Sequence, residues 1–167
     1  MKGKKILVVD DDIDVVAVLQ TILENEGFEV IVAHNKIDGV KKAIESKPDL
    51  AILDVMMTTH FEGFEMAREL FETPELKNIP RLMQTSIQVL PTNNQDVIGM
   101  ARQLRKSPEY KELEVLLIED TKTNQAGIDY ISKEGKNIWV PVDGFLHKPV
   151  DSKKLLPTIE KLLNKKN

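Results

Sequence analysis

Residues 5–12 read KILVVDDD, a short apolar run rich in β-branched residues that ends in three consecutive aspartates. Such a run predicts a strand that is buried on both faces, as the strands of a parallel sheet are. Residues 13–26 then repeat apolar side chains at helical spacing, and Gly27 stands where the end of a helix favours glycine. Because residues 28–33 form a second apolar, β-branched run, this segment predicts a strand–helix–strand unit.

The same alternation of short apolar runs and amphipathic segments recurs further along the chain. It predicts strands at 50–53, 80–85 and 145–147, and helices at 35–46, 63–71 and 151–163. Strands that alternate with helices at this spacing form a parallel sheet covered on both faces. The expected fold class is therefore α/β, with a doubly wound parallel sheet whose functional residues lie beyond the carboxyl ends of the strands.

The composition limits both the size of the protein and its chemistry. The chain has 167 residues, enough for one domain, and is 41% hydrophobic and 30% charged with a net charge of −4. The lack of cysteine excludes disulfides, thiolate metal sites and cysteine nucleophiles. We find no signal peptide and no apolar run long enough to span a membrane, and the acidic balance argues against a nucleic-acid surface. We therefore expect a cytoplasmic single domain, residues 1–167, without an output domain.

The segment of residues 87–143 is longer than one helix and two loops require, so it predicts an insertion between the fourth and fifth strands of the sheet. Within the insertion, the pattern predicts a helix at 96–106 and a strand at 114–118. It also predicts a further helix at 123–133, followed by a loop that ends at Gly144.

Polar side chains that can take part in chemistry stand at the ends of four predicted strands, at 5–9, 50–53, 80–85 and 145–147. These side chains are Asp10, Asp11, Asp12, Asp54, Thr85, Ser86 and Lys148. Carboxylates held close together do not all stay ionised easily without a cation, and Mg²⁺ suits a small carboxylate set that awaits a phosphate. A carboxylate can also act as a nucleophile, and phosphoryl transfer requires mainly positioning and positive charge. The set is chemically complete for transfer of a phosphoryl group to an aspartate.

Four stretches together resemble the signature of the response-regulator receiver domain family. They are ILVVDDD at 6–12, LDVMM at 53–57, TS at 85–86 and GFLHKPV at 144–150. The resemblance covers residues 4–86 and 144–164, and it identifies the chain as a stand-alone variant with an enlarged segment between strands four and five. It implies a flavodoxin-like (βα)5 fold that is phosphorylated on aspartate by a histidine kinase.

The resemblance also implies a role for each residue of the acidic site. Asp54 would be the phosphoacceptor, and Asp11 and Asp54 would bind Mg²⁺ directly. Asp10 would act on the Mg²⁺ mostly through water. Met56 would contribute its backbone carbonyl, so that the identity of its side chain would not matter for coordination. Asp12, one residue past the acidic pair, is expected to cap the first helix.

Three further residues match the switch positions of the family. Thr85 would supply the switch hydroxyl, and Lys148 would pair with the phosphoryl group and the acidic cluster. Phe145 matches the aromatic switch position, although it is equally well interpreted as a core aromatic. A phosphoryl group adds charge and acceptor oxygens that recruit Thr85 and Lys148, which would bias a two-state surface near strands four and five.

The sequence departs from the family pattern in two places. The loop after Asp54 reads MMTTHFEG at 56–63, one residue longer than usual and without the proline that commonly follows the second methionine. We expect His60 in this loop to be solvated rather than functional. The larger departure is the insertion at 87–143, for which our hypothesis is that it forms the partner-specific surface.

The partners follow from this interpretation. We expect a histidine kinase or a phosphotransfer protein to supply the phosphoryl group, and an unknown protein target to receive the signal through protein–protein contact. No direct contact with nucleic acid or a membrane is expected. The protein would not be an enzyme beyond catalysing its own phosphorylation and dephosphorylation.

Two alternative functions remain open. The spacing of Asp10 and Asp12 after the first strand also fits haloacid-dehalogenase-like phosphatases, in which Asp10 would be the nucleophile of an aspartyl-phosphate phosphohydrolase. The other alternative is a receiver-like binding module that no longer takes phosphate. A flavin-binding module is excluded, because it needs a phosphate loop rich in Ser, Thr and Gly where this chain places three negative charges.

Overall fold

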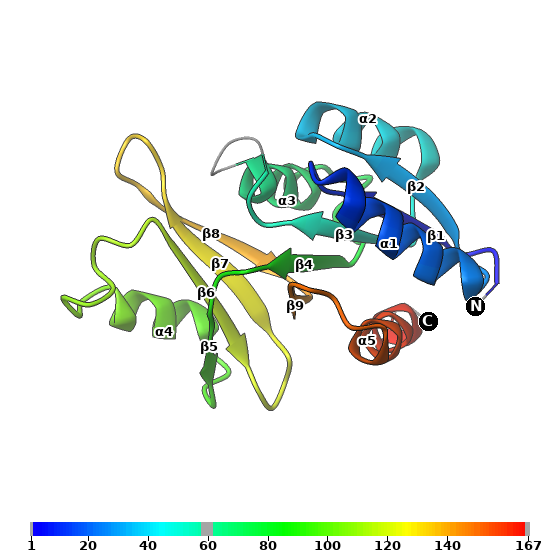
Figure 1. Ribbon diagram of the computed structural model, residues 1–167. Coiled ribbons are helices and arrows are strands. Elements are labelled where there is room, and N and C mark those ends of the chain that lie inside the picture. The colour runs from blue at the N-terminus through cyan, green and yellow to red at the C-terminus, as the bar shows by residue number, and fades with distance from the viewer. Residues whose placement is uncertain (1, 58–61, 166–167) are drawn as a thin grey trace.

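In the computed structural model, which describes residues 2–57 and 62–165, five parallel strands form one sheet in the order β2-β1-β3-β4-β9 (Figure 1). The strands are β1 (Lys5–Val9), β2 (Glu29–Ala33), β3 (Leu50–Asp54), β4 (Arg81–Thr85) and β9 (Gly144–His147). The helices between and around them are α1 (Ile13–Asn25), α2 (Lys36–Ser46), α3 (Glu62–Glu72) and α5 (Ser152–Lys165). The strand order confirms the predicted doubly wound α/β fold, and these elements lie within two residues of their predicted bounds.

Helices cover the parallel sheet on both faces (Figure 1). On one face, α1 and α5 bury Leu19 and Ile159 against a layer of sheet side chains that includes Val8. On the other face, α2 and α3 bury residues such as Ala43 and Phe64. Because removal of this apolar surface from water is the main favourable contribution to folding, the strands are fixed between two layers and their carboxyl ends are held in place.

The helix starts and stops follow from local side-chain chemistry. The Asp12 carboxylate accepts hydrogen bonds from the backbone N–H groups of Asp14 and Val15, which confirms Asp12 as the N-cap of α1. Asn35 caps α2 in the same way, by accepting from the N–H of Asp38. After α1, Gly27 adopts a φ of +91°, a left-handed conformation that glycine adopts without strain.

The segment between β4 and β9 forms a second sheet with one helix. Its elements are β5 (Val89–Thr92), α4 (Val97–Leu104), β6 (Val115–Asp120), β7 (Ala126–Ile131) and β8 (Asn137–Val142). The strand order is β5-β6-β7-β8, in which β5 and β6 are parallel and the other pairs are antiparallel. One face of this second sheet packs against α4, and the other joins the core beneath α3.

The predicted helix at 123–133 is wrong, because this segment forms a turn and then strand β7. Ala126, Ile128 and Tyr130 alternate toward the core beneath α3, while Gly127 and Asp129 occupy the positions between them. This period of two is the pattern of a strand rather than a helix. The predicted loop that ends at Gly144 is also wrong in part, since it contains β8, and β5 was not predicted. The helix at 96–106 and the strand at 114–118 are confirmed as α4 and β6.

Buried charges fasten α4 to the second sheet. The Arg105 Nε atom lies 2.7 Å from Oδ2 of Asp129, and Arg102 reaches Oδ1 of the same carboxylate at 2.8 Å. Arg105 also donates to the backbone carbonyls of Tyr110 and Leu113. Since Asp129 is fully buried, these contacts are what compensates the cost of removing its charge from water.

A second buried arginine lies at the seam between the two sheets. Arg81, in β4, donates from Nη2 to the carbonyl of Pro141 in β8 at 3.0 Å, and its guanidinium lies 5.2 Å from the centre of the Phe71 ring. The Asp143 carboxylate accepts from the Arg81 backbone N–H at 2.8 Å. The contact with Pro141 ties β8 to β4, the strand next to the edge strand β9 of the parallel sheet. Among the described helices, none combines the length and the apolar character needed to cross a membrane.

Candidate functional site

The carboxyl ends of β1, β3 and β9 bring together two buried carboxylates and one ammonium group. Lys148, which follows β9, places Nζ 3.0 Å from Oδ2 of Asp10 and 3.2 Å from Oδ2 of Asp54. Asp10 is fully buried and Asp54 is 4% exposed. The register explains the meeting, because Val9 of β1 pairs with Leu53 of β3, so that the next residue of each strand lies at the same level of the sheet.

The Asp10 carboxylate is hydrogen-bonded on both oxygens. Its Oδ1 accepts from the backbone N–H of Asp12 at 2.9 Å, and its Oδ2 accepts from Nε2 of Gln84 at 2.7 Å in addition to Lys148. Gln84 was missed by the sequence analysis. The available signal was a long polar residue within the otherwise apolar end of strand β4, but nothing in the sequence places it against Asp10.

The start of α3 supports the backbone on the other side of Asp54. An added Cβ at Gly63 would lie 2.1 Å from the carbonyl oxygen of Asp54 and 2.3 Å from that of Val55. Only a residue without a side chain permits this close approach of the helix to the end of β3. The Asp54 carboxylate also accepts a long hydrogen bond, 3.4 Å, from the backbone N–H of Met56.

Burial and like charge shift the ionisation of the acidic residues. Burial and then the charge of Asp10 raise the pKa of Asp54 to about 6, against the opposing effect of Lys148. Burial and Asp10 also raise the pKa of Asp11, which is the exposed member of the cluster. Burial of Lys148 would lower its pKa, but its contacts with Asp10 and Asp54 outweigh burial and the pKa is raised. The cluster therefore holds more negative charge than its one ammonium group compensates.

The donor set fits a hard divalent cation. One carboxylate oxygen each from Asp10, Asp11 and Asp54 lies within 4.8 Å of the others, and this is the sole group of three such ligands among the residues that the structure describes. Oxygen ligands in a small acidic cluster suit Mg²⁺, which usually keeps several waters and binds through a few carboxylates. The predicted fourth ligand, the backbone carbonyl of Met56, belongs to the residue whose N–H contacts Asp54.

Two of the three predicted switch residues, Thr85 and Phe145, lie on the neighbouring strands β4 and β9. Thr85 is buried at the end of β4, and its Oγ1 accepts a hydrogen bond from the backbone N–H of Ile87 at 2.8 Å. Phe145, in β9, is partly buried and packs against the core beneath α3. Its switching role stays a prediction. The predicted position of His60 lies outside the described residues.

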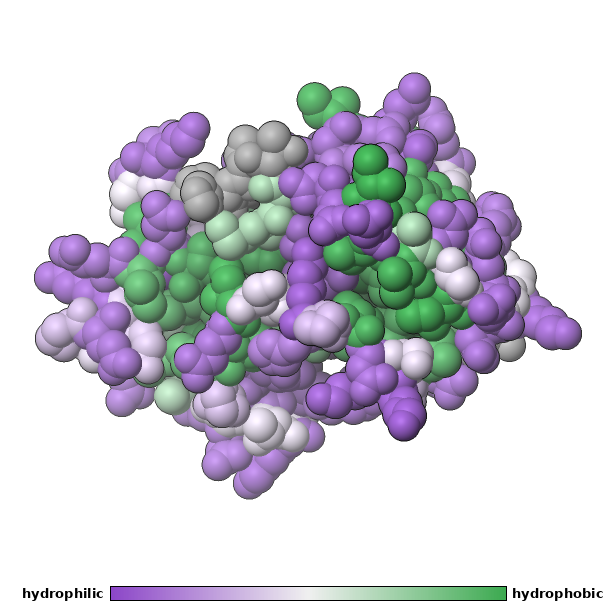
Figure 2. Space-filling view, viewed as in Figure 1, coloured by the Kyte–Doolittle hydropathy of each residue, from purple (hydrophilic) through white to green (hydrophobic). Residues whose placement is uncertain are grey.

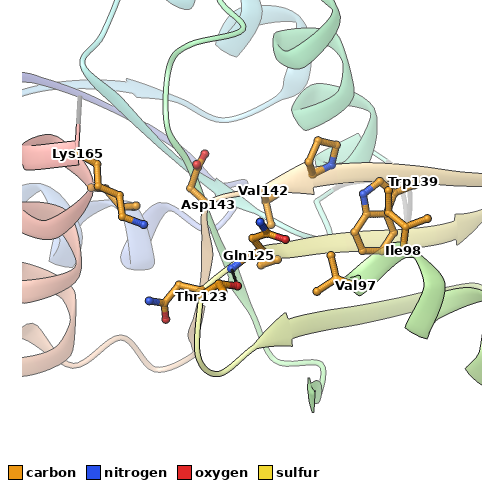
Figure 3. Close-up of a pocket in the computed structure, with 12 residues that line it drawn as sticks. Val97, Ile98, Thr123, Gln125, Trp139, Val142, Asp143 and Lys165 are labelled. Carbon is orange, nitrogen blue, oxygen red and sulfur yellow. Dashed lines mark hydrogen bonds between the residues drawn. The ribbon is translucent and has the colours of Figure 1, made fainter. Parts of the chain in front are cut away.

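A hollow elsewhere on the molecule contains none of the predicted site residues. It is lined by α4, β8 and the end of α5, and Figure 3 shows the Trp139 ring beside Ile98 and Val97. Asp143 and Lys165 lie at its other end. The hollow lacks the convergent charged groups that distinguish the strand ends of the parallel sheet.

Residues 6–118 match the family model of the response regulator receiver domain, which is more than half of the chain. The chain belongs to the response regulator receiver domain family. Receiver domains are signalling modules of two-component systems. The match ends within β6, whereas the fifth strand of the parallel sheet of this receiver domain is β9, because the second sheet lies between them.

Curated relatives resemble parts of this receiver domain. The alkaline phosphatase synthesis transcriptional regulatory protein PhoP of Bacillus subtilis is 46% identical over 68 residues, which cover 41% of this chain and 28% of PhoP. The CpxR homolog of Haemophilus influenzae is 40% identical over 82 residues, or 49% of this chain and 34% of that protein. The match therefore spans about a third or less of these two proteins. Protein PilH of Pseudomonas aeruginosa is 35% identical over 49% of this chain and 67% of PilH.

Solved structures share the fold across almost the whole receiver domain. A CheY-like receiver domain protein from Methanospirillum hungatei superimposes with a TM-score of 0.62 at 21% identity, covering 99% of this chain and 97% of that chain. A response regulator from Chloroflexus aurantiacus gives a TM-score of 0.61 at 18% identity, covering 98% and 99%. At this level of identity the likeness concerns the fold alone.

Proposed function

We propose that this receiver domain is the phosphoacceptor switch of a two-component phosphorelay, in which Asp54 takes a phosphoryl group from a histidine kinase or phosphotransfer protein. The observation that carries the proposal is the buried Asp54 carboxylate, 3.2 Å from Lys148 Nζ and grouped with two further aspartates. Its pKa of about 6 leaves it mostly ionised at neutral pH, as a nucleophile must be.

The transfer exchanges one bond to phosphorus for another. One Asp54 carboxylate oxygen forms a bond to phosphorus as the bond between phosphorus and the imidazole nitrogen of the donor breaks, and the electron pair leaves with the imidazole. Lys148 holds a positive charge beside the Asp54 oxygen, where charge on the phosphoryl oxygens has to be stabilised. Asp11, Asp54 and the Met56 carbonyl, with Asp10 mostly through water, would hold Mg²⁺, which would supply further positive charge there.

A switch that reaches the second sheet follows from the contacts of Thr85. A phosphoryl group on Asp54 adds acceptor oxygens to which the Thr85 hydroxyl can donate. If Thr85 moves toward them, the N–H of Ile87 loses its partner, and β5 begins only two residues later. Residues 87–143, an insertion within a single receiver domain, would then carry the output surface, and Phe145 packs against the apolar core to which β7 and β8 of this segment contribute.

An apolar hollow beside the site is suited to a protein partner. It is lined by Val15 and Val18 of α1 and by Pro149 and Val150, with Lys148 at its edge. Figure 2 shows hydrophobic side chains gathered on the molecular face over α1. Val18 is 55% exposed, and exposed apolar patches of this kind mark interaction sites. We propose that the kinase or phosphotransfer protein docks here, which brings its histidine to Asp54.

The test is the mass of the intact protein after incubation with acetyl phosphate and Mg²⁺. We expect one added phosphoryl group, which is absent without Mg²⁺ and absent in Asp54→Asn. Asp14→Asn, an exposed carboxylate of α1 outside the cluster, is the matched control and should accept the group normally. No adduct in the parent protein would contradict the proposal and favour a binding module, and an adduct that persists in Asp54→Asn would favour a hydrolase that uses Asp10.

A further inference from the structure

Gln84 is a buried polar side chain at the site. It has no role in the proposed transfer of a phosphoryl group to Asp54. It lies in β4 opposite Asp54 of β3 and Leu146 of β9. Because side chains alternate along a strand, Gln84 shares a face with Leu82, which packs in the apolar layer under α1 and α5. A leucine or methionine would satisfy this environment, yet the chain places a fully buried amide there.

The two ends of the Gln84 amide have different surroundings. Nε2 donates to Oδ2 of Asp10 at 2.7 Å, the oxygen that also accepts from Lys148. The opposite amide orientation is unfavourable, because an ionised carboxylate has no hydrogen to donate to Oε1. Oε1 is buried and has no hydrogen-bond partner among residues 2–57 and 62–165. A buried unpartnered carbonyl destabilises the folded state and offsets the stabilisation from the Nε2 hydrogen bond, so stability alone does not explain the amide at this position.

The hydrogen bond from Gln84 to Asp10 matters most for the orientation of the Asp10 carboxylate when Lys148 leaves Asp10 for another partner. In the unphosphorylated protein, Asp10 Oδ2 accepts from both Lys148 and Gln84. When Lys148 turns to the phosphoryl group, Gln84 remains as the side-chain donor to Asp10. The carboxylate then stays oriented, and its other oxygen remains on the N–H of Asp12. Groups that orient a ligand in this way tune metal affinity without touching the metal.

We propose that Gln84 is a positioning residue that holds the Asp10 carboxylate in the geometry required for Mg²⁺ binding, both before and after phosphorylation. This inference rests on the proposed function, because it assumes that Asp10 serves the metal site. It makes Gln84 part of the switch chemistry rather than of the apolar core in which its side chain is buried.

The test compares Mg²⁺ binding with stability in Gln84→Met, a substitution that keeps the length of the side chain and removes the amide. Isothermal titration of the full chain with Mg²⁺, without a phosphodonor, is expected to show affinity weakened about tenfold or more, the usual effect of losing a group that orients a metal ligand. Thermal unfolding in EDTA is expected to show little net change in Tm, because the loss of the Nε2 donor to Asp10 and the removal of the unpartnered carbonyl have opposite effects on stability.

Leu82→Met is the matched control. Leu82 is a fully buried residue of the same strand and face, so that its replacement tests the effect of a methionine in this layer. Its Mg²⁺ affinity should equal that of the parent. If Gln84→Met binds Mg²⁺ with the affinity of the parent, the positioning role is refuted while the proposed function stands. The same conclusion follows if the Mg²⁺ affinity of Gln84→Met falls only together with its Tm. If the parent itself binds no Mg²⁺, both the inference and the proposed function fail.

Discussion

Replacement of Asp54 by asparagine is expected to stabilise the protein at neutral pH in the absence of metal. The pKa of Asp54 is about 6 in the folded protein, whereas the ordinary value is 3.8. Since each pKa unit corresponds to about 1.4 kcal/mol, the ionised carboxylate lowers the free energy of unfolding by about 3 kcal/mol. Asparagine keeps the shape of the side chain and removes the charge that burial and Asp10 oppose.

The pH dependence has a definite sign. A carboxyl group whose pKa is raised on folding binds its proton more tightly in the folded state. The stability that the protonated carboxyl group gives is therefore fully present only well below pH 3.8, where both states are protonated, and is lost as the pH rises through about 6. The increase in the free energy of unfolding caused by Asp54→Asn should accordingly be largest above pH 7 and should become small near pH 4.

The assay is thermal and urea unfolding of the two proteins in EDTA at pH 7.5 and pH 4. For a chain of this size, about 3 kcal/mol corresponds to a rise in Tm of roughly 6–12 °C. Addition of Mg²⁺ should narrow the difference at pH 7.5, because the cation compensates the charge of the parent protein. Asp14→Asn serves as the control and should show neither effect. An Asp54→Asn protein that is no more stable than the parent at pH 7.5, or equally stabilised at both pH values, would refute this account of the site.

Four further substitutions test the contacts around the site and in the second sheet. Lys148→Met leaves two buried carboxylates without their ammonium partner, so urea unfolding in EDTA should show a loss of about 3 kcal/mol, and an unchanged midpoint would contradict the pairing. Arg105→Met should cost about 3 kcal/mol, whereas Arg102→Met, whose side chain is 41% exposed, should cost less than about 1 kcal/mol; equal losses would argue against the buried bridge. Gly127→Ala would place a Cβ 2.1 Å from the Trp139 ring, so it should destabilise by roughly 1–3 kcal/mol and shift the fluorescence of this single tryptophan, and an unshifted spectrum would contradict the packing.

The sequence was sufficient to predict the parallel sheet and most of the acidic site. Buried strands of a parallel sheet are short apolar runs, and their carboxyl ends meet at one edge. Asp10, Asp54 and Lys148 each come directly at such an end, and the structure places Lys148 Nζ within 3.2 Å of an oxygen of each aspartate. The positions of the strands follow from the periodicity of apolar residues, and the meeting of their ends follows from the order of strands and helices along the chain. A single sequence contains both.

The second sheet was predicted poorly because its strands are specified by distant partners. Strand β7 is short and mixes Gly127 and Asp129 with apolar residues, so its pairing with β6 and β8 decides its conformation. Strand β5 contains Pro91, which opposes a strand assignment but is tolerated at the edge of a sheet, where β5 lies. Gln84 was missed for a related reason, since its partner Asp10 is 74 residues away along the chain.

The location of the phosphoryl group decides whether Asp54 is the phosphoacceptor. The protein would be treated with acetyl phosphate and Mg²⁺, the acyl phosphate would be reduced with borohydride, and the modified residue would be found by tandem mass spectrometry of its peptides. We expect modification at Asp54 alone. Modification at Asp10 or Asp11, or none at any residue, would contradict it.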